Sequence, residues 1–384
     1  MELDRLLQDE SLRRREFPVA AERVFLAHAA VAPLPDRVRR RMQNHLDAAC
    51  RDDQEAVLGE GFFRETRALA ARLLGVEPAE VALLGPTSTG LSLVAEGLPF
   101  NAGDNVLVCR EDYPSNVYPW LGLRRRGVEV RYLRSSRPGC VTAEEVLAQV
   151  DERTRLVSLA SCHFVTGWRP DIDAIGRELH ARGVWFCVDG IQTLGAFPTP
   201  LAHVDFLAAD AHKWLLGPGG AGVFYVRREV QEDLRPVLLG WHNVRCPDFV
   251  ALDQLDLRSD ARRYEPGTAN VVGLVGLRAA LELLLEVGLD AIAVELLRKR
   301  RRLIAGLHER GMELLLPDAP ETHASAIVSF RPRNETPESL HQRLTAAGFV
   351  VSLRTMPGAG RWIRLSPHFY NTDEELDRLL AFLG

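Results

Sequence analysis

Lys213 stands in the stretch DAHKWLLGPGGAG at residues 210–222, and it is one of two lysines among 47 basic residues. An ammonium can be desolvated, lose its proton and become a nucleophile, whereas a guanidinium stays protonated. Such an amine attacks carbonyl carbons and forms imines. Because apolar runs flank Lys213, we predict a reactive amine here; a lysine whose charged end reaches solvent is the alternative. Lys299 lies in the basic run LRKRRR, so we predict an exposed position for it.

Two further groups of polar residues stand where predicted strands end. Asp189 closes the apolar run WFCVD, and Gln192 follows it. A carboxylate is unfavourable to bury without a cationic partner. Thr87, Ser88 and Thr89 lie between a strand-like run and a helical one, where hydroxyl and N–H groups can bind phosphate; simple N-capping is the alternative. Ligands bind at the strand ends of open α/β sheets, so we expect these groups to meet at one edge.

The order of apolar and amphipathic segments predicts an α/β fold. From about residue 80, continuous apolar runs alternate with helical ones, which indicates a mostly parallel sheet. After about residue 270, one long helical stretch at 271–311 leads into short strands and a last helix, which indicates a smaller α+β domain. We therefore predict three parts: an N-terminal helical segment at 1–24, a large cofactor-binding domain at 25–270 and a small C-terminal domain at 271–384.

Composition narrows the classes of partner. The net charge of −5 gives no global basic field for nucleic acid. No apolar run approaches the ~20 residues of a membrane span, and the charged N-terminus lacks the apolar core of a signal peptide. The six cysteines are not at metal-binding spacing, which favours reduced thiols. We expect a cytoplasmic protein with no metal, no nucleic acid and no membrane partner.

Gly217, Gly219 and Gly222 match the spacing of a dinucleotide-binding loop. That loop requires a helix after it, and the residues that follow here, GVFYVRRE, are typical of a strand. We therefore predict a tight turn that holds the lysine loop, and a nicotinamide-dependent dehydrogenase becomes the weaker hypothesis.

The chain resembles the class V aminotransferase family of fold-type I pyridoxal-phosphate enzymes, which includes cysteine desulfurases and isopenicillin N epimerase-like proteins. The resemblance runs from about residue 25 to the C-terminus and depends on the motifs TSTGLSLVA, VDGIQ, DAHKWLLGPGGAGVFYV, PGTAN and WIRLSPHFYNTDEELDRLL. The resemblance implies the fold of the fold-type I enzymes and the cofactor pyridoxal 5'-phosphate. The aldehyde, ring nitrogen and phosphate of that cofactor suit an amine, a carboxylate and a helix N-terminus.

The resemblance also implies roles for the matched residues. Lys213 would hold the cofactor as an internal aldimine and then act as the base at Cα, Asp189 would bind the ring nitrogen, and Arg364 would bind the substrate carboxylate. His28 is a further candidate for substrate binding, with a core position as the alternative. The remaining implied cofactor contacts are Thr87, Ser88, Thr89, Tyr113 stacked on the ring, Gln192, Asp210, His212 as the better phosphate contact, and Thr268, which would reach the phosphate held by the partner subunit of a homodimer.

The fate of an amino acid deprotonated at Cα stays open. We predict transamination or a β-elimination of the carbon–sulfur lyase kind, with amino-acid epimerisation as the first alternative. Cysteine desulfurases carry a nucleophilic cysteine shortly before the arginine motif, and VSLRTMPGAGRWIRLS contains none, so desulfuration is a weaker alternative. A non-enzymatic binding or regulatory module with this fold is the remaining hypothesis, and the retained lysine, aspartate and arginine argue against it.

Overall fold

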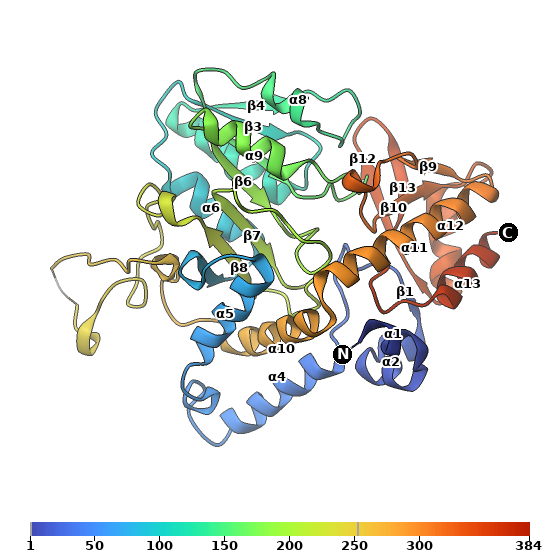
Figure 1. The fold of residues 1–384 in the computed structure, drawn as a ribbon, viewed down its shortest axis with the longest axis horizontal. Coiled ribbons are helices and arrows are strands. Elements are labelled where there is room, and N and C mark those ends of the chain that lie inside the picture. Colours follow the sequence, from blue (N-terminus) through green and yellow to red (C-terminus); the bar gives the residue numbers. More distant parts are fainter. Residues whose placement is uncertain (1, 252) are drawn as a thin grey trace.

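A seven-stranded sheet forms the centre of the computed structural model, which describes residues 2–251 and 253–384 (Figure 1). Its strands are β2 (Val81–Leu84), β3 (Asn105–Cys109), β4 (Glu129–Leu133), β5 (Thr154–Ala160), β6 (Trp185–Asp189), β7 (Phe206–Asp210) and β8 (Gly222–Val226). They lie in the order β2-β8-β7-β6-β5-β3-β4. Within the described sheet, β8 runs antiparallel to both of its neighbours, β2 and β7, and the other neighbouring strands pair in parallel. The predicted α/β fold with a mostly parallel sheet is confirmed.

Helices cover both faces of this sheet, which explains why its inner strands are mostly apolar. The helices are α4 (Asp36–Ala49), α5 (Phe62–Leu74), α6 (Thr87–Gly97), α7 (Tyr118–Gly122), α8 (Ala143–Leu147), α9 (Ile172–Ala181) and α10 (Val271–Val287). Leu107, Val157 and Phe186 face the side packed by α5, α9 and α10. Val106, Cys187 and their neighbours face α6 and α7 on the other side. Every residue of β3, β7 and β8 is buried between these layers.

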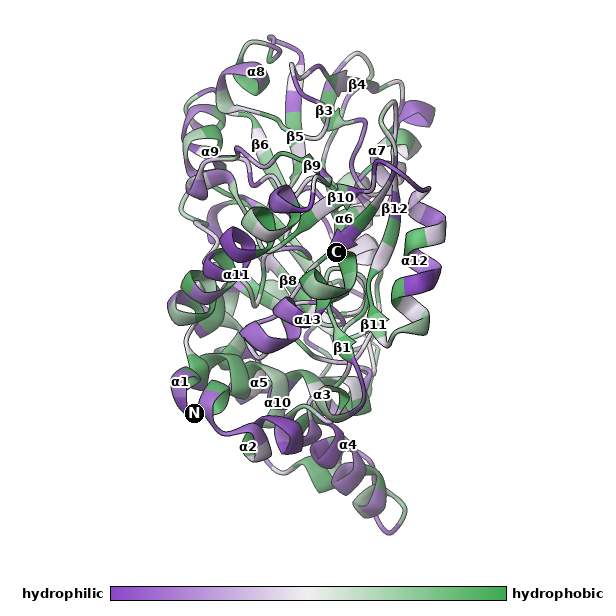
Figure 2. Ribbon diagram, turned by 90° about the vertical axis from the view of Figure 1, so that its right-hand side faces the viewer, coloured by the Kyte–Doolittle hydropathy of each residue, from purple (hydrophilic) through white to green (hydrophobic). Residues whose placement is uncertain are grey.

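The C-terminal third builds a second, four-stranded antiparallel sheet. In the order β12-β13-β10-β9, its strands are β12 (Ser352–Met356), β13 (Gly360–Leu365), β10 (Val328–Arg331) and β9 (Glu313–Leu315). The helices α11 (Leu289–Glu309), α12 (Pro337–Ala346) and α13 (Asp373–Leu383) accompany it. The short strand β1 (Val24–Phe25) pairs in parallel with β11 (Phe349–Val350), so the start of the chain joins this second region (Figure 2).

The long helix predicted at 271–311 is two helices, α10 and α11, which meet at Gly288. Gly288 has a φ of 90°, and a Cβ atom there would meet nothing within 4 Å. The backbone conformation, and not lack of space, therefore requires glycine and breaks the helix. α10 packs with α4 and α5 against the large sheet, while α11 crosses to the second one (Figure 1). The division predicted at residue 270 stays a prediction.

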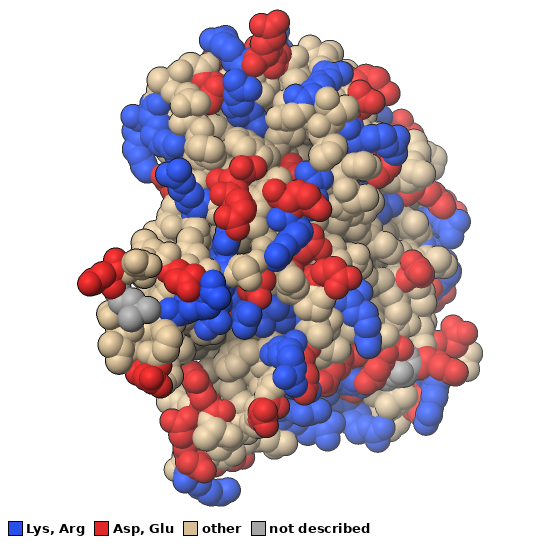
Figure 3. Space-filling view, turned by 60° about the vertical axis from the view of Figure 1, so that its left-hand side comes forward, with Lys and Arg blue, Asp and Glu red and all other residues tan. Residues whose placement is uncertain are grey.

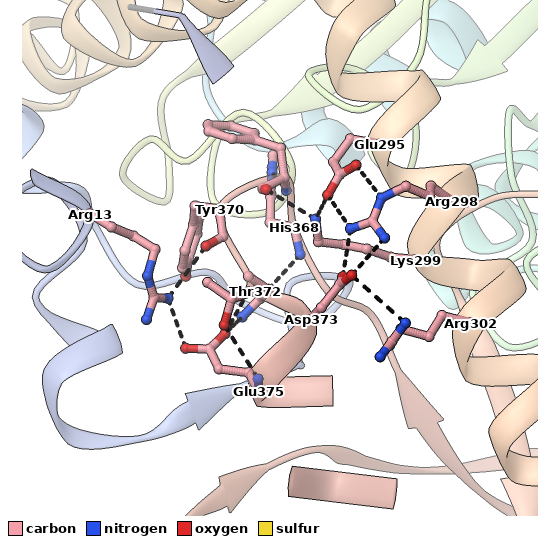
Figure 4. A network of polar contacts seen from close by, with 12 residues as sticks. Arg13, Glu295, Arg298, Lys299, Arg302, His368, Tyr370, Thr372, Asp373 and Glu375 are labelled. Atoms are coloured by element: carbon pink, nitrogen blue, oxygen red, sulfur yellow. Dashed lines mark hydrogen bonds and ion pairs between the residues drawn. The ribbon is translucent and has the colours of Figure 1, made fainter. Parts of the chain in front are cut away.

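The N-terminal segment forms α1 (Leu3–Gln8), α2 (Glu10–Glu16) and α3 (Val19–Glu22). Leu6 and Phe17 are buried in the main core, so these helices pack on the body of the protein. Arg13 Nη1 donates to Glu375 Oε1 at 2.8 Å, and the ring of Phe17 stacks on that of Tyr370 with centroids 3.9 Å apart. The first helices are therefore fixed to the segment around α13 (Figure 4).

The predicted exposure of Lys299 is wrong, because the basic run of α11 is wound around a helix and not spread over one face. Lys299 is fully buried, pairs with Glu295 one turn earlier and donates to Phe369 O at 3.3 Å (Figure 4). Burial lowers the pKa of Lys299 to about 8, against the opposing effect of Glu295. The neighbouring Arg298 donates to Glu295 as well and also reaches Asp373 with both Nη atoms. This lysine is thus a structural cation.

Acidic and basic side chains intermix over the face shown in Figure 3. Within the described ranges, no helix is both long enough and apolar enough to cross a membrane.

Candidate active site

A pocket of about 320 Å³ opens where β6 and β7 end, beside the first turn of α6. The carboxyl ends of parallel strands share one edge of a sheet, so side chains distant in sequence meet here. Residues of the second sheet close the pocket from the other side. Its lining contains Thr87, Ser88, Tyr113, Asp189, Gln192, Asp210, His212, Lys213 and Arg364 among the residues expected from the sequence.

Lys213 follows β7 by three residues and is only 8% exposed. Among the described residues Nζ has no hydrogen-bond partner, and it lies 5.4 Å from the centroid of the Tyr113 ring. Burial lowers the pKa of Lys213 to about 8; Asp189 opposes this shift, and Arg364 and Arg354 reinforce it. About a tenth of the amine is therefore unprotonated at pH 7, far more than for an exposed lysine, and this unprotonated form is the nucleophile or base.

Asp189 is the last residue of β6 and is almost completely buried. Oδ1 accepts a hydrogen bond from Ile191 N at 3.0 Å, and the described residues supply no other hydrogen bond to this carboxylate. Burial raises the pKa of Asp189, while the Ile191 amide and Lys213 oppose that rise. One carboxylate oxygen is thus left for a cationic ligand group in the pocket.

Gln192 braces the wall of the pocket. Its Nε2 donates to Ala29 O at 3.1 Å and its Oε1 accepts from Trp214 Nε1 at 2.9 Å. His368 Nε2 donates to Trp214 O at 3.0 Å from the second region. The residue next to Lys213 is therefore held from two sides, which fixes the position of the lysine backbone.

The first turn of α6 and the end of β7 form a cradle for an anion. Thr87 Oγ1 accepts from Asp210 N at 3.0 Å, and free N–H groups at the start of α6 lie beside Ser88. Asp210 Oδ2 pairs with His212 Nδ1 at 2.9 Å, and both carboxylate oxygens accept from Gly220 N at 3.1 Å. Asp210 thereby orients His212 and is itself occupied.

The glycines after the lysine form the predicted turn. Residues 219–220 are a turn, and β8 begins at Gly222. A Cβ atom at Gly222 would lie 2.3 Å from Ala209 O, so close strand pairing excludes any side chain there. The hypothesis of a tight turn followed by a strand is confirmed, and the dinucleotide motif has no helix after it.

Arg364 brings a buried positive charge from β13. Its Nη1 donates to Phe164 O at 2.6 Å, and Nη2 lies 3.5 Å from Ser352 Oγ. Within residues 2–251 and 253–384, Nε has no partner and no carboxylate pairs with this side chain. Burial lowers the pKa of Arg364 to about 9. A buried guanidinium without an acidic partner is a site for an incoming carboxylate.

Three expected residues lie outside this pocket. His28 is completely buried, with Nδ1 2.9 Å from Ser366 O and Nε2 2.8 Å from Tyr370 Oη, and burial lowers its pKa to about 3. The core position left open for His28 is therefore the correct one. Thr89 follows Ser88 but does not line the pocket. Thr268 lines a second cavity of about 460 Å³.

Sequence reasoning missed Arg354 and Phe164, both in the lining. Arg354 lies on β12, whose residue Ser352 is paired with Arg364 of β13, so alternation puts Arg354 on the same face as Arg364. The alternation could be inferred from the sequence, but the strand register that places the two arginines together could not.

The chain is similar to known proteins over most of its length. The family model described as "Aminotransferase class-V" matches residues 24–379. A probable cysteine desulfurase of Methanothermobacter thermautotrophicus is 29% identical over 95% of each chain. The isopenicillin N epimerase of Streptomyces clavuligerus is 28% identical over 90% of each chain.

Among solved structures, the cystine C–S lyase C-DES, in complex with its reaction product cysteine persulfide, superposes with a TM-score of 0.86. The match covers 96% of this chain and 98% of that one, at 22% identity. At this identity the likeness establishes the shared fold.

In the cofactor-free protein, Lys213→Met is expected to raise stability at pH 7. Burial lowers the pKa of Lys213 from 10.5 to about 8. At pH 7 the folded state holds a buried ammonium, which costs on the order of 2–3 kcal/mol. Between pH 8 and 10.5 the folded state loses its proton before the unfolded state does, so the advantage of the variant should shrink as pH rises.

Thermal melts of both proteins across this pH range measure the effect. Arg361→Gln, which changes an exposed residue of β13 paired with Glu338, is the control and should change little. A variant that is no more stable at pH 7, or whose advantage grows with pH, contradicts this account of Lys213.

Proposed function

The chain belongs to the aminotransferase class-V family, and from this premise we propose a pyridoxal-phosphate-dependent enzyme that acts at the Cα of an amino acid, with transamination or β-elimination as its outcome. Enzymes of this family depend on pyridoxal 5'-phosphate. The observation that carries the proposal is the buried Lys213 amine without a hydrogen bond, in the same pocket as Asp189 and Arg364. Burial lowers the pKa of Lys299 in the same way, but Lys299 is paired with Glu295 away from the pocket, whereas Lys213 faces the pocket without a hydrogen bond. A non-enzymatic module has no need of an unpaired amine in that position.

The groups left unused in the pocket fit this cofactor. When bound, pyridoxal phosphate supplies an electron sink for negative charge that develops at Cα. Asp189 would keep a proton on the ring nitrogen through its unengaged carboxylate oxygen. Ser88 and the first N–H groups of α6 would bind the phosphate together with His212, and Tyr113 would lie against the ring.

Arg364 and Lys213 would then divide the work on the substrate. The Arg364 guanidinium would bind the α-carboxylate in a bidentate manner and orient the Cα–H bond. Lys213 Nζ would accept the Cα proton, since its low pKa leaves the amine free to do so. Lys213 is only 8% exposed, which limits water around Nζ, so a proton held there can be returned to the substrate.

The absence of a cysteine from the segment just before Arg364 supports transamination or β-elimination over desulfuration. β12 and β13 form a hairpin in which Met356 pairs with Gly360, so only residues 357–359 connect them. Cys162, which lies toward Arg364, is completely buried, and burial raises the pKa of its thiol to about 11. Near Arg364, Cys162 therefore offers no accessible thiolate on which a protein-bound persulfide could form. The isopenicillin N epimerase relative keeps epimerisation as the alternative.

A homodimer with an active site at its interface is part of the proposal. The segment at residues 237–251 projects from the body (Figure 1) and exposes large apolar side chains, including Leu239, Trp241 and Phe249. Trp241 and Thr268 line the same cavity beside Gly220, at the back of the lysine loop. If a second copy covered this surface, Thr268 of one copy would lie close to the cofactor phosphate held by the other copy. Free thiols at all six cysteines support a cytoplasmic location.

The purified protein is expected to be yellow, and borohydride should fix the cofactor on the peptide that contains Lys213. With two lysines in the chain, peptide mass mapping separates Lys213 from the buried Lys299 without ambiguity. Lys213→Ala should abolish the covalent label while the protein still folds, as judged by circular dichroism. A protein that stays colourless with added cofactor, or a label on Lys299, contradicts the assignment.

Exchange of the α-proton in deuterated water should accompany turnover of the cognate amino acid, because this step precedes every branch. Arg364→Gln should slow it by about tenfold or more through loss of the charged contact to the carboxylate. With cysteine or cystine, product analysis should give a keto acid, and mass spectrometry should find no catalytic persulfide on the protein. A persulfide that disappears when its cysteine is replaced would establish desulfuration instead.

Subunit mixing tests the predicted role of Thr268. Lys213→Ala and Thr268→Asp chains are each expected to be inactive, the second because its carboxylate repels the phosphate. If Thr268 acts across the interface, one site in each mixed dimer is intact, and an equal mixture should recover about a quarter of wild-type activity. Mixed dimers that are confirmed by mass but inactive would place Thr268 outside the partner's site.

A further inference from the structure

Arg354 is a second guanidinium in the active-site pocket. It lies on β12, is half-buried and lines the same cavity as Arg364 and Lys213. Its Nη1 donates to Leu353 O, the carbonyl of the preceding residue, at 2.9 Å. In the part of the chain that the structure describes, this is the only hydrogen bond of the side chain, and no carboxylate pairs with it.

The strand register sets the spacing between the two arginines. Arg364 pairs across the hairpin with Ser352, and Arg354 pairs with Trp362. Arg354 and Arg364 are therefore diagonal neighbours on one face of the sheet, with Cβ atoms roughly 7–8 Å apart. Two guanidinium groups that enter one pocket from the same face can bind the two anionic groups of one small ligand. The proximity also has an electrostatic effect, because burial first and Arg354 second lower the pKa of Arg364.

The acidic residues of the pocket do not balance this charge. Asp210 is occupied by His212 and Gly220, and Asp189 lies opposite Lys213. Burial lowers the pKa of Arg354, and Tyr113 alone opposes that shift. One substrate carboxylate on Arg364 would still leave Arg354 without an anion.

Two other arginines of this sheet have structural roles and are paired with acidic side chains. Arg331 on β10 forms a two-fold ion pair with Glu313 and lies over the ring of Trp362. Arg361 on β13 pairs with Glu338. Each has an acidic partner outside the pocket, whereas Arg354 turns into the pocket with none among the described residues.

We propose that Arg354 binds a second anionic group of the substrate, so that the enzyme selects amino acids whose side chain ends in a carboxylate or a sulfinate. The proposal rests on the proposed function of this pocket. Arg364 takes the α-carboxylate, Arg354 takes the distal anion through charge-assisted hydrogen bonds, and the distance between them limits the length of the side chain. Neutral amino acids leave Arg354 unpaired.

Binding of unreactive acids to the holoenzyme tests this without turnover. Calorimetry should find glutarate bound at least about tenfold more tightly than butyrate, which lacks the second carboxylate. Arg354→Gln should bring the ratio close to one and leave the affinity for butyrate within about twofold, whereas Arg364→Gln should weaken both acids. Arg361→Gln, a neighbouring arginine outside the pocket, should leave both affinities unchanged.

Turnover supplies a second measurement. For wild type, kcat/KM should be higher for cysteine sulfinate and aspartate than for alanine and asparagine, and Arg354→Gln should remove this preference. Equal wild-type affinities for glutarate and butyrate, or an Arg354→Gln variant that weakens both acids alike, would overturn the proposal. The visible spectrum measures cofactor loading separately. A colourless protein would contradict the proposed function, whereas the ratio of the affinities for glutarate and butyrate tests the role of Arg354.

Discussion

The burial of one amine beside one carboxylate is the constraint around which this molecule is organised. Lys213 and Asp189 both lie in surroundings that disfavour their charged forms, and each offsets the other's desolvation. The position of each is fixed by a strand end, β7 for the lysine and β6 for the aspartate. Those strands can carry such groups because their remaining residues are apolar and packed from both faces. The apolar packing of the sheet thus offsets the unfavourable free energy of burying the two charged groups.

The two sheets contribute different chemistry to the same pocket. The large sheet presents the amine, the carboxylate and the anion cradle at the start of α6, while the small sheet presents guanidinium groups from β12 and β13. Arg364 crosses the boundary, since its Nη1 donates to Phe164 O of the large region. His368 crosses it as well, through Trp214 O. The position of the substrate carboxylate relative to Lys213 therefore depends on how the two regions pack.

Much of this could be predicted from the sequence, because the informative signals are local. The apolar runs between helices predicted the large sheet, and the strand end at Asp189 and the isolated Lys213 predicted chemistry. Non-local facts could not be obtained in this way. The register between β12 and β13 places Arg354 in the pocket, and it depends on pairing between strands. The burial of Lys299 depends on which face of α11 meets Phe369.

The contact between Arg13 and Glu375 joins residues 362 positions apart. The N-terminal helices pack on the main core through Leu6 and Phe17, but the ion pair of Arg13 with Glu375 forms only when α13 is in place. The loop that carries His368 and Tyr370 lies between these two ends and takes its final position with them (Figure 4). His368, on that loop, donates a hydrogen bond to the carbonyl of Trp214, the residue next to Lys213. The wall of the pocket is in this way tied to the contact between α2 and α13, which are both far from Lys213 in the sequence.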